Sequence, residues 1–167
     1  MKILFYNHTG KISGAERVLL TILRQLDRRR FEPLLVCPSA GELREMIRPL
    51  NIRMIVSDPL AARFTFRPKE LLEYFISFVP SIRATRSIVR SEKPELIHAN
   101  SVRAGLVMSA ATLGLRVSVI WHVHDLLPRH PLSTAIRIFV FALPRTHIIA
   151  VSNAVAVSFR GDRKSVV

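Results

Sequence analysis

A turn that contains glycine joins an apolar run to a helical pattern near the start of the chain, and no other segment constrains the fold as much. The run Ile3–Tyr6 predicts a buried strand, and apolar residues then recur at helical spacing between Val18 and Leu26. Gly14 lets the backbone approach a ligand closely, and the free N–H groups of a first helical turn favour an anion. The turn matches neither the dinucleotide fingerprint nor the P-loop pattern. It therefore predicts either a plain strand-to-helix turn or a phosphate site of another kind.

Short apolar runs rich in β-branched residues alternate with helical patterns along the whole chain. The predicted strands are Ile3–Tyr6, Pro33–Cys37, Arg53–Val56, Leu96–Ala99, Val117–Trp121 and His147–Val151. The predicted helices are Ala15–Leu26, Glu42–Leu50, Lys69–Ser91, Val102–Leu113, Ser133–Leu143 and Asn153–Phe159. Such alternation builds βα units, so we expect an α/β fold with a doubly wound, Rossmann-like parallel sheet.

The composition indicates one globular domain that is strongly basic. Of the 167 residues, 49% are hydrophobic and 22% charged, and 25 Lys and Arg against 12 Asp and Glu give a net charge of +13. That charge attracts anionic partners. Cys37 is the only cysteine, so an intramolecular disulfide is impossible and a cytoplasmic location is expected. Residues 1–8 do not resemble an export signal, and the apolar stretch 132–143 is too short to cross a bilayer.

Polar side chains occur where four of the predicted strands end. They are Asn7 and His8 at the first strand, His98, Asn100 and Ser101 at the fourth, His122, His124 and Asp125 at the fifth, and Ser152 and Asn153 at the sixth. Each has a structural explanation on its own, because serine caps helices and asparagine suits turns. Ligands of such sheets bind beyond the carboxyl ends of the strands, so we expect these side chains to converge on one site.

The sharpest cluster is His122-Val-His124-Asp125. If the strand continues to His124, both histidines point to the same face, and Asp125 can orient one of them for acid–base chemistry. A zinc site needs three or four ligands, and Leu126 and Leu127 occupy the next positions, so we expect no metal. A purely structural pair of histidines is the alternative.

Four motifs together resemble glycosyltransferase family 4, whose members are retaining enzymes with the GT-B fold. They are Ser13-Gly-Ala-Glu-Arg-Val-Leu-Leu, Leu96-Ile-His-Ala-Asn-Ser, Val119-Ile-Trp-His-Val-His-Asp and Ile149-Ala-Val-Ser-Asn-Ala. The resemblance covers essentially the whole chain in the family's order and spacing. It implies that the chain is the N-terminal, acceptor-side half of such an enzyme.

The resemblance also implies a donor site. The donor would be a nucleotide-diphosphate sugar, with no cofactor and no metal, and Ser13 and Gly14 would lie against its diphosphate. Ser13 stands where many relatives have glycine. His124 would lie near the transferred sugar with Asp125 beside it, and His122 is the weaker match for that role.

Three further residues would line the same cleft on the acceptor side, namely Asn100, Ser101 and Asn153. Family members carry a second Rossmann-like half that holds most of the donor and bears paired glutamates. We therefore expect residues 1–159 to be one domain, residues 160–167 to be a linker or tail toward a missing C-terminal domain, and the chain alone to be inactive.

A basic helix bears on the acceptor. Arg83, Arg86 and Arg90 fall on one face of the predicted helix 69–91, which Pro80 is expected to kink or split. With the apolar stripe before them, they predict contact with an anionic membrane surface, and hence a saccharide or lipid-linked acceptor used by a peripheral, cytoplasmic enzyme. A solvated helix face is the alternative reading.

The composition and fold class also allow two other function classes. Nucleic-acid binding is disfavoured, because the basic residues are spread along the chain and aromatic residues make up only 7%. The remaining alternative is a non-catalytic, basic Rossmann-like module that binds a nucleotide, a nucleic acid or an anionic membrane.

Overall fold

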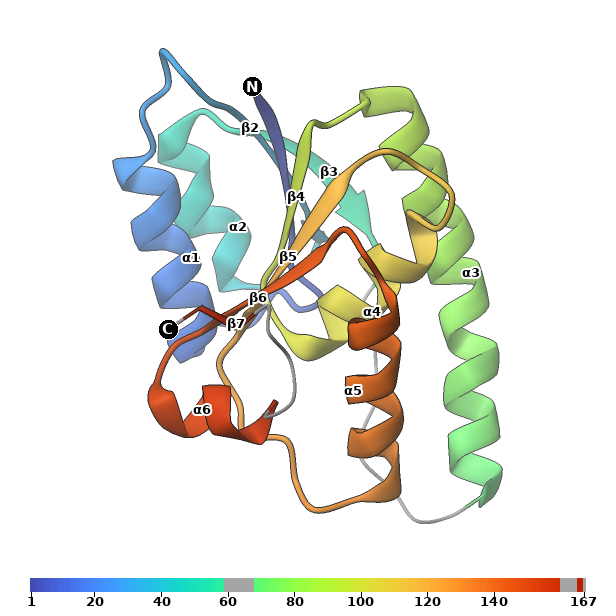
Figure 1. The fold of residues 1–167 in the computed structure, drawn as a ribbon. Coiled ribbons are helices and arrows are strands. Elements are labelled where there is room, and N and C mark those ends of the chain that lie inside the picture. Colours follow the sequence, from blue (N-terminus) through green and yellow to red (C-terminus); the bar gives the residue numbers. More distant parts are fainter. Residues whose placement is uncertain (59–67, 160–164, 167) are drawn as a thin grey trace.

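The computed structural model describes residues 1–58, 68–159 and 165–166, and within helix α3 it describes side chains from Phe78 onward. Its centre is a parallel sheet with the strand order β3-β2-β1-β4-β5-β6-β7 (Figure 1). The strands are β1 (Lys2–Tyr6), β2 (Glu32–Pro38), β3 (Arg53–Ser57), β4 (Leu96–Ala99), β5 (Ser118–Val123), β6 (Thr146–Ala150) and β7 (Ser165–Val166). The order reverses between β1 and β4, so the sheet is doubly wound as predicted.

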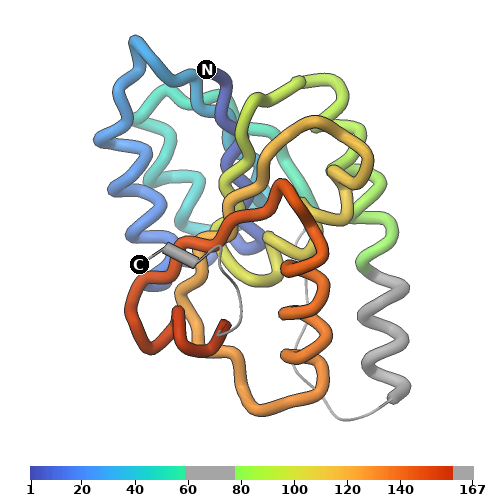
Figure 2. Tube along the Cα trace, viewed as in Figure 1, coloured from blue at the N-terminus to red at the C-terminus, as the bar shows by residue number. Residues whose placement is uncertain are grey.

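Helices cover both faces of the sheet. They are α1 (Gly14–Gln25), α2 (Glu42–Ile47), α3 (Pro68–Glu92), α4 (Val102–Ala111), α5 (Pro131–Ala142) and α6 (Asn153–Ser158), with the 3-10 turn η1 (Arg48–Leu50) after α2. Figures 1 and 2 show α1 and α2 on one side of the sheet and α3, α4 and α5 on the other. Successive strand residues point to opposite faces, so strands β1 to β4 contribute apolar side chains to two separate cores, while those of β5 and β6 belong to the core on the α4 side.

Most predicted boundaries shift by a few residues, and three differences from the sequence-based prediction matter more. Strand β5 runs two residues further, to Val123, because both Trp121 and Val123 are buried beneath the helices on the α4 side and pair with β6. Helix α3 is not split at Pro80, since Phe78 and Ile82 on either side of the proline both pack against the core. In the segment expected to be a linker or tail, residues 165–166 form β7 beside β6, and the rest lies outside the described residues.

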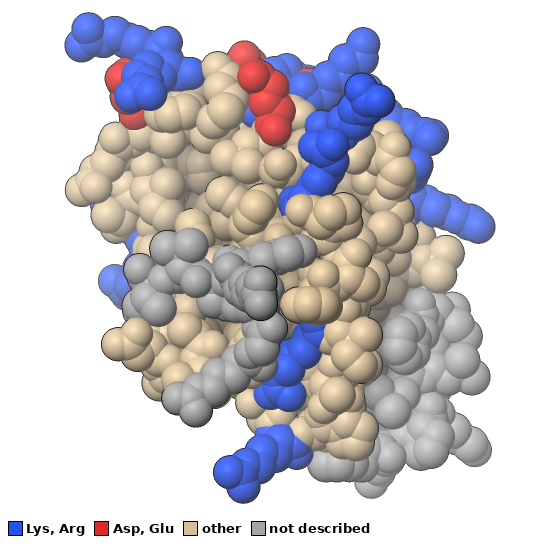
Figure 3. Space-filling view, in the orientation of Figure 1, with Lys and Arg blue, Asp and Glu red and all other residues tan. Residues whose placement is uncertain are grey.

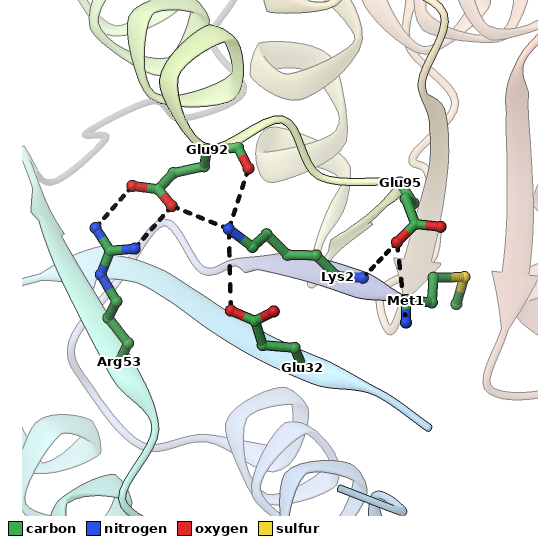
Figure 4. Close-up of polar contacts among 6 residues, drawn as sticks. All are labelled: Met1, Lys2, Glu32, Arg53, Glu92 and Glu95. Carbon is green, nitrogen blue, oxygen red and sulfur yellow. Dashed lines mark hydrogen bonds and ion pairs between the residues drawn. The ribbon is translucent and has the colours of Figure 1, made fainter. Parts of the chain in front are cut away.

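Ion pairs fasten the amino end of the sheet, opposite the end where ligands are expected. Glu92, at the end of α3, accepts two hydrogen bonds of 2.8 Å from the Arg53 guanidinium on β3 and lies 3.5 Å from Lys2 Nζ on β1 (Figure 4). The Arg53 contact lowers the pKa of the Glu92 carboxyl. Lys2 also donates its backbone N–H to Glu95. The long helix is thus tied to two strands.

Helix α4 approaches the sheet closely through Gly105. A Cβ atom at this position would lie 2.2 Å from Cδ2 of the fully buried Trp121 ring. That ring is held in place, because its Nε1–H donates to Ser109 Oγ at 2.9 Å. Only glycine therefore fits between α4 and β5 without a shift of the helix.

We expect Gly105→Ala to destabilise the fold by about 1–3 kcal/mol, because the methyl group overpacks the contact with Trp121. Gly14→Ala is the matched control, since a Cβ there meets no atom within 4 Å; its free energy of unfolding should change by less than about 1 kcal/mol. Urea unfolding of both variants measures the difference. Equal stability of the two variants would refute the packing argument.

Two histidines are buried on the α1 face of the sheet. The rings of His98 on β4 and His122 on β5 lie 5.2 Å apart edge to face, and Phe5 on β1 lies 5.1 Å from His98. The Nδ1 atoms of both histidines are buried, and within the described part of the chain they have no hydrogen-bond partner. Burial lowers the pKa of His98 to about 3 and that of His122 to about 4, so both rings are neutral in the folded chain.

This buried pair predicts loss of stability in mild acid. Histidines in the unfolded chain titrate at about pH 6.5. Below that pH the unfolded state binds protons that the folded state does not bind. The stabilisation is complete above that pH and declines toward the lowered pKa values, at up to ~1.4 kcal/mol per pH unit for each histidine. Urea unfolding at several pH values should show a shallower decline for His122→Gln than for the unmodified chain, with the exposed His147→Gln as control. Parallel profiles for all three proteins would contradict it.

Candidate functional site

A cleft of about 1150 Å³ opens at the carboxyl ends of the strands, where the strand order reverses between β1 and β4. Its walls come from the turn after β1, the start of α1, the residues after β4 and β5, and helices α3, α4 and α5. Seven of the predicted residues line it together, namely His8, Ser13, Gly14, Asn100, Ser101, His124 and Asp125. This is the position where doubly wound sheets bind ligands.

Hydrogen bonds between buried amides hold three strand ends together. Asn100, after β4, donates from Nδ2 to Asn7 Oδ1 at 3.0 Å, and both side chains are fully buried. The same nitrogen lies 3.3 Å from the carbonyl oxygen of Ala15 in the first turn of α1. Asn100 Oδ1 lies 3.2 Å from Nε2 of His124. Asn100 thus connects β1, α1 and the end of β5.

A second polar group lies across the β1–β4 junction. His8 Nδ1 is 3.0 Å from Ser101 Oγ, and His8 Nε2 is 3.4 Å from Arg103 Nη1. Ser101 also caps α4, because its hydroxyl accepts the backbone N–H of Ala104. Burial, and then the nearby Arg103 charge, lower the pKa of His8.

The predicted phosphate turn is organised by Glu16. Its carboxylate accepts the backbone N–H of Ser13 at 2.9 Å and also the Ser13 hydroxyl, in a capping-box arrangement. Gly14 has open space around it, as a ligand-facing glycine requires. Gly10 is explained by packing, because a Cβ there would clash with the backbone of Ala40 in the loop after β2. Of the two glycines, Gly14 is therefore the one that faces the cleft.

His124 is one of two half-buried histidines in the cleft, and its ring lies 4.4 Å from the ring of the buried His122. Burial lowers its pKa, and the negative charges of Asp125 and Glu16 partly oppose that shift. A neutral imidazole offers one donor and one acceptor, so at neutral pH it can orient a hydroxyl group of a ligand. The exposed Asp125 lies beside it at the cleft.

Other predicted residues lie away from the cleft walls. His122 is in the buried histidine pair, and Asn153 is exposed at the start of α6. Arg83 and Arg90 are exposed on α3. Arg86 is half-buried and donates to the carbonyl oxygens of Ala111 and Leu113 at 2.7 and 2.9 Å, where it binds the end of α4. The three arginines are therefore not equivalent.

The far end of the cleft is apolar. Its side chains come from three helices, and they include Phe78 and Ile82 of α3, Leu106 of α4, and Leu132, Ile136 and Phe139 of α5. Helix α5 is also apolar on its outer side, where Ile138 and Phe141 are 64% and 61% exposed. One continuous cleft thus joins a polar end to a hydrocarbon-like end.

Sequence reasoning did not single out Glu16 and Arg103 as site residues. Glu16 has a readable signal, because Ser13-x-x-Glu16 is a capping-box pattern. Arg103 has none, since its contact with His8 joins residues 95 positions apart. Within the described residues, no group of three or more His, Cys, Asp and Glu side chains is placed to hold a metal ion. In the same part of the chain, each helix is too short or too polar to cross a membrane.

Comparison with known proteins places these features in a family. The sequence profile of glycosyltransferase family 4 matches residues 12–164. A search of curated protein sequences gave no significant match. HepE of Anabaena, solved in complex with UDP-glucose, is 26% identical with a TM-score of 0.70, over 99% of this chain and 43% of HepE.

Two more distant structures share the fold. The lipopolysaccharide outer core galactosyltransferase WaaB has 15% identity and a TM-score of 0.73, over 100% of this chain and 45% of WaaB. The UDP-GlcNAc 2-epimerase of Neisseria meningitidis has 16% identity and a TM-score of 0.59, over 100% of this chain and 46% of the epimerase. The chain therefore spans less than half the length of each of these proteins. The fold alone does not separate transferases from epimerases, but the profile match does: the chain belongs to glycosyltransferase family 4 and has the fold of the N-terminal half of a GT-B enzyme.

Proposed function

We propose that this chain is the acceptor-side half of a retaining glycosyltransferase. The complete enzyme moves a hexosyl unit from a nucleotide-diphosphate sugar to an acceptor used in cell-surface polysaccharide or glycolipid synthesis. The observation that carries the proposal is the cleft at the sheet's switch point, with Ser13, Gly14 and His124 on its walls in a chain of family 4. HepE, which was solved with UDP-glucose, supports the donor class.

Ser13 and Gly14 are the proposed donor contacts. As the nucleotide diphosphate leaves, negative charge builds on its oxygens, and preorganised positive potential lowers the barrier. The N-terminus of α1 supplies part of that potential, and the cleft residues Lys11 and Arg103 supply full charges. We propose that these groups, together with positive groups from the second half of the enzyme, allow transfer without a metal ion or another cofactor.

His124, with Asp125 beside it, is the proposed contact to the transferred sugar. The neutral ring can hold a sugar hydroxyl, and Asp125 places negative charge near the ring. Asn100 contacts the His124 ring from the neighbouring strand end, and Ser101 contacts His8 in the same cleft. His122 and Asn153 lie outside the cleft walls, so we assign them no contact with the acceptor.

A lipid-linked acceptor fits the cleft better than a free saccharide. The polar end suits a sugar or phosphate head group, and the apolar end between α3 and α5 suits the hydrocarbon that would follow it. The outward Ile138 and Phe141, with the exposed Arg83 and Arg90 on α3, suit a peripheral position on an anionic membrane at its cytoplasmic face. Figure 3 shows basic side chains dispersed around one face of the molecule, which gives no continuous track for a nucleic acid there.

The proposal first requires the rest of the enzyme. Sequencing the source locus beyond the codon for Val167 should reveal a second βα-repeat half with paired glutamates. The complete product should transfer hexose with retained anomeric configuration, measured by NMR of the product, whereas the 167-residue chain alone should show no turnover. Transfer by the isolated chain, or a complete product that transfers no sugar, would contradict the proposal.

In the complete enzyme, His124→Ala should lower kcat/KM about 100-fold, because a positioned neutral imidazole is lost from the transferred sugar. Thr21→Ala, on the exposed side of α1, is the control and should keep full activity. Steady-state kinetics with the donor sugar varied measures both. An unaffected His124→Ala enzyme would remove His124 from the mechanism.

Phe139→Gln should weaken binding of farnesyl phosphate to the chain roughly five- to tenfold, because it places a polar side chain in the apolar end of the cleft. The matched control is Ile138→Gln on the outer side of α5, which should bind normally. Isothermal titration calorimetry measures binding, and inorganic phosphate as a second ligand separates the contribution of the phosphate head group from that of the hydrocarbon. Weaker binding in Ile138→Gln but not in Phe139→Gln would assign the hydrocarbon to the outer face of α5 instead, and equal losses in both would reject a hydrocarbon site in the cleft.

A further inference from the structure

Two backbone carbonyl groups fix the direction of the hydrogen bonds around His124. The carbonyl oxygen of Thr9 lies 2.6 Å from Asn7 Nδ2, and that of Ala15 lies 3.3 Å from Asn100 Nδ2. A carbonyl oxygen can only accept, so in each case the amide nitrogen must face it. The orientation of both buried asparagine amides follows from the backbone alone.

The orientation of the Asn7 amide then fixes which atom of each amide donates and which accepts. With Asn7 Nδ2 donating to Thr9, Asn7 Oδ1 is free to accept, and it receives Asn100 Nδ2 at 3.0 Å. Asn100 Oδ1 is thereby turned away from Asn7 and toward the end of β5. It lies 3.2 Å from Nε2 of His124.

An amide oxygen facing a ring nitrogen requires a proton on that nitrogen. Nε2 of His124 must therefore carry the hydrogen, and in the neutral ring Nδ1 must carry the lone pair. Within the described residues, no hydrogen bond engages Nδ1, while the half-buried ring lines the cleft.

We propose that Asn7 and Asn100 are positioning residues that hold His124 in its Nε2–H tautomer and leave Nδ1 as a hydrogen-bond acceptor open to the cleft. An acceptor at this point suits a ligand that presents a hydroxyl group. That the hydroxyl belongs to a sugar rests on the proposed function. The assignment of the tautomer does not depend on the proposed function.

The other histidine of the cleft has the opposite arrangement. An arginine can only donate, so the contact with Arg103 assigns the lone pair of His8 to Nε2 and its hydrogen to Nδ1, which faces Ser101 Oγ. Both ring nitrogens of His8 are then engaged by protein groups. His124 is thus the cleft histidine with a nitrogen left for a ligand.

Long-range proton–nitrogen correlation NMR of the chain near neutral pH tests the tautomers directly. The signals of His124 and His8 are identified by their loss in His124→Gln and His8→Gln. We expect a protonated Nε2 and an unprotonated Nδ1 at His124, and the reverse at His8, each as a single form. The Nδ1–H form at His124, or a mixture of both forms as in free histidine, overturns the proposal.

Asn100→Ala tests the positioning role, with Ser101→Ala as the matched control on the next residue. Asn100→Ala should return His124 to a mixture of tautomers without changing His8, whereas Ser101→Ala should disturb His8 alone. An unchanged His124 in folded Asn100→Ala rejects the role of Asn100. If Asn100→Ala does not fold, the spectrum of the unmodified chain still decides the tautomer. No sugar donor is present, so failure here is separate from failure of the proposed glycosyl transfer.

Discussion

The hydrogen bond between the Asn7 and Asn100 side chains is the interaction on which the cleft depends. It joins the ends of β1 and β4, the two neighbouring strands between which the strand order reverses. Both amides are fully buried, where an unpaired polar group costs about 1–3 kcal/mol, so each must find partners. Their remaining partners are the backbone of the phosphate turn, the first turn of α1 and the ring of His124. Satisfying two buried amides thus sets the relative positions of all the polar walls.

Much of this fold is readable from local pattern, and much of the site is not. Alternating strand and helix periods predict the doubly wound sheet, because the spacing of apolar residues within each segment reports the face that this segment buries. The end of β5 was placed too early, since Trp121 and Val123 are held in the strand by the helices beneath it. The sequence places Asn7 among the strand-end residues expected to converge, but it does not show that Asn7 pairs with Asn100, 93 positions away. Arg86 reads as one of three equivalent surface arginines, yet its contacts to the end of α4 give it a structural role.

The histidines show why residue type alone does not define a site. His98 and His122 are on the same face of the sheet as His124 and lie next to it, but burial keeps them neutral and their free nitrogens are enclosed. Their contribution is to present an uncharged floor, because a charged ring there would require a counterion in the core. His8 reaches the cleft with both nitrogens engaged by Ser101 and Arg103. Burial and hydrogen bonding therefore separate the four histidines into a buried pair, one cleft histidine with both nitrogens engaged, and His124, the proposed ligand contact.

The charge distribution in the cleft bears on why such an enzyme needs two halves. Glu16 occupies the Ser13 N–H and hydroxyl and places a carboxylate at the N-terminus of α1, where a diphosphate is expected. Lys11 and Arg103 oppose that charge, but Asp125 adds a second negative group at the same cleft. Among the described residues that line the cleft, an incoming diphosphate thus meets two cations and two carboxylates, with little net attraction at short range. We therefore expect this half to orient the sugar and the acceptor, while strong binding of the nucleotide diphosphate depends on cations or helix N-termini that a second domain brings to the open side of the cleft.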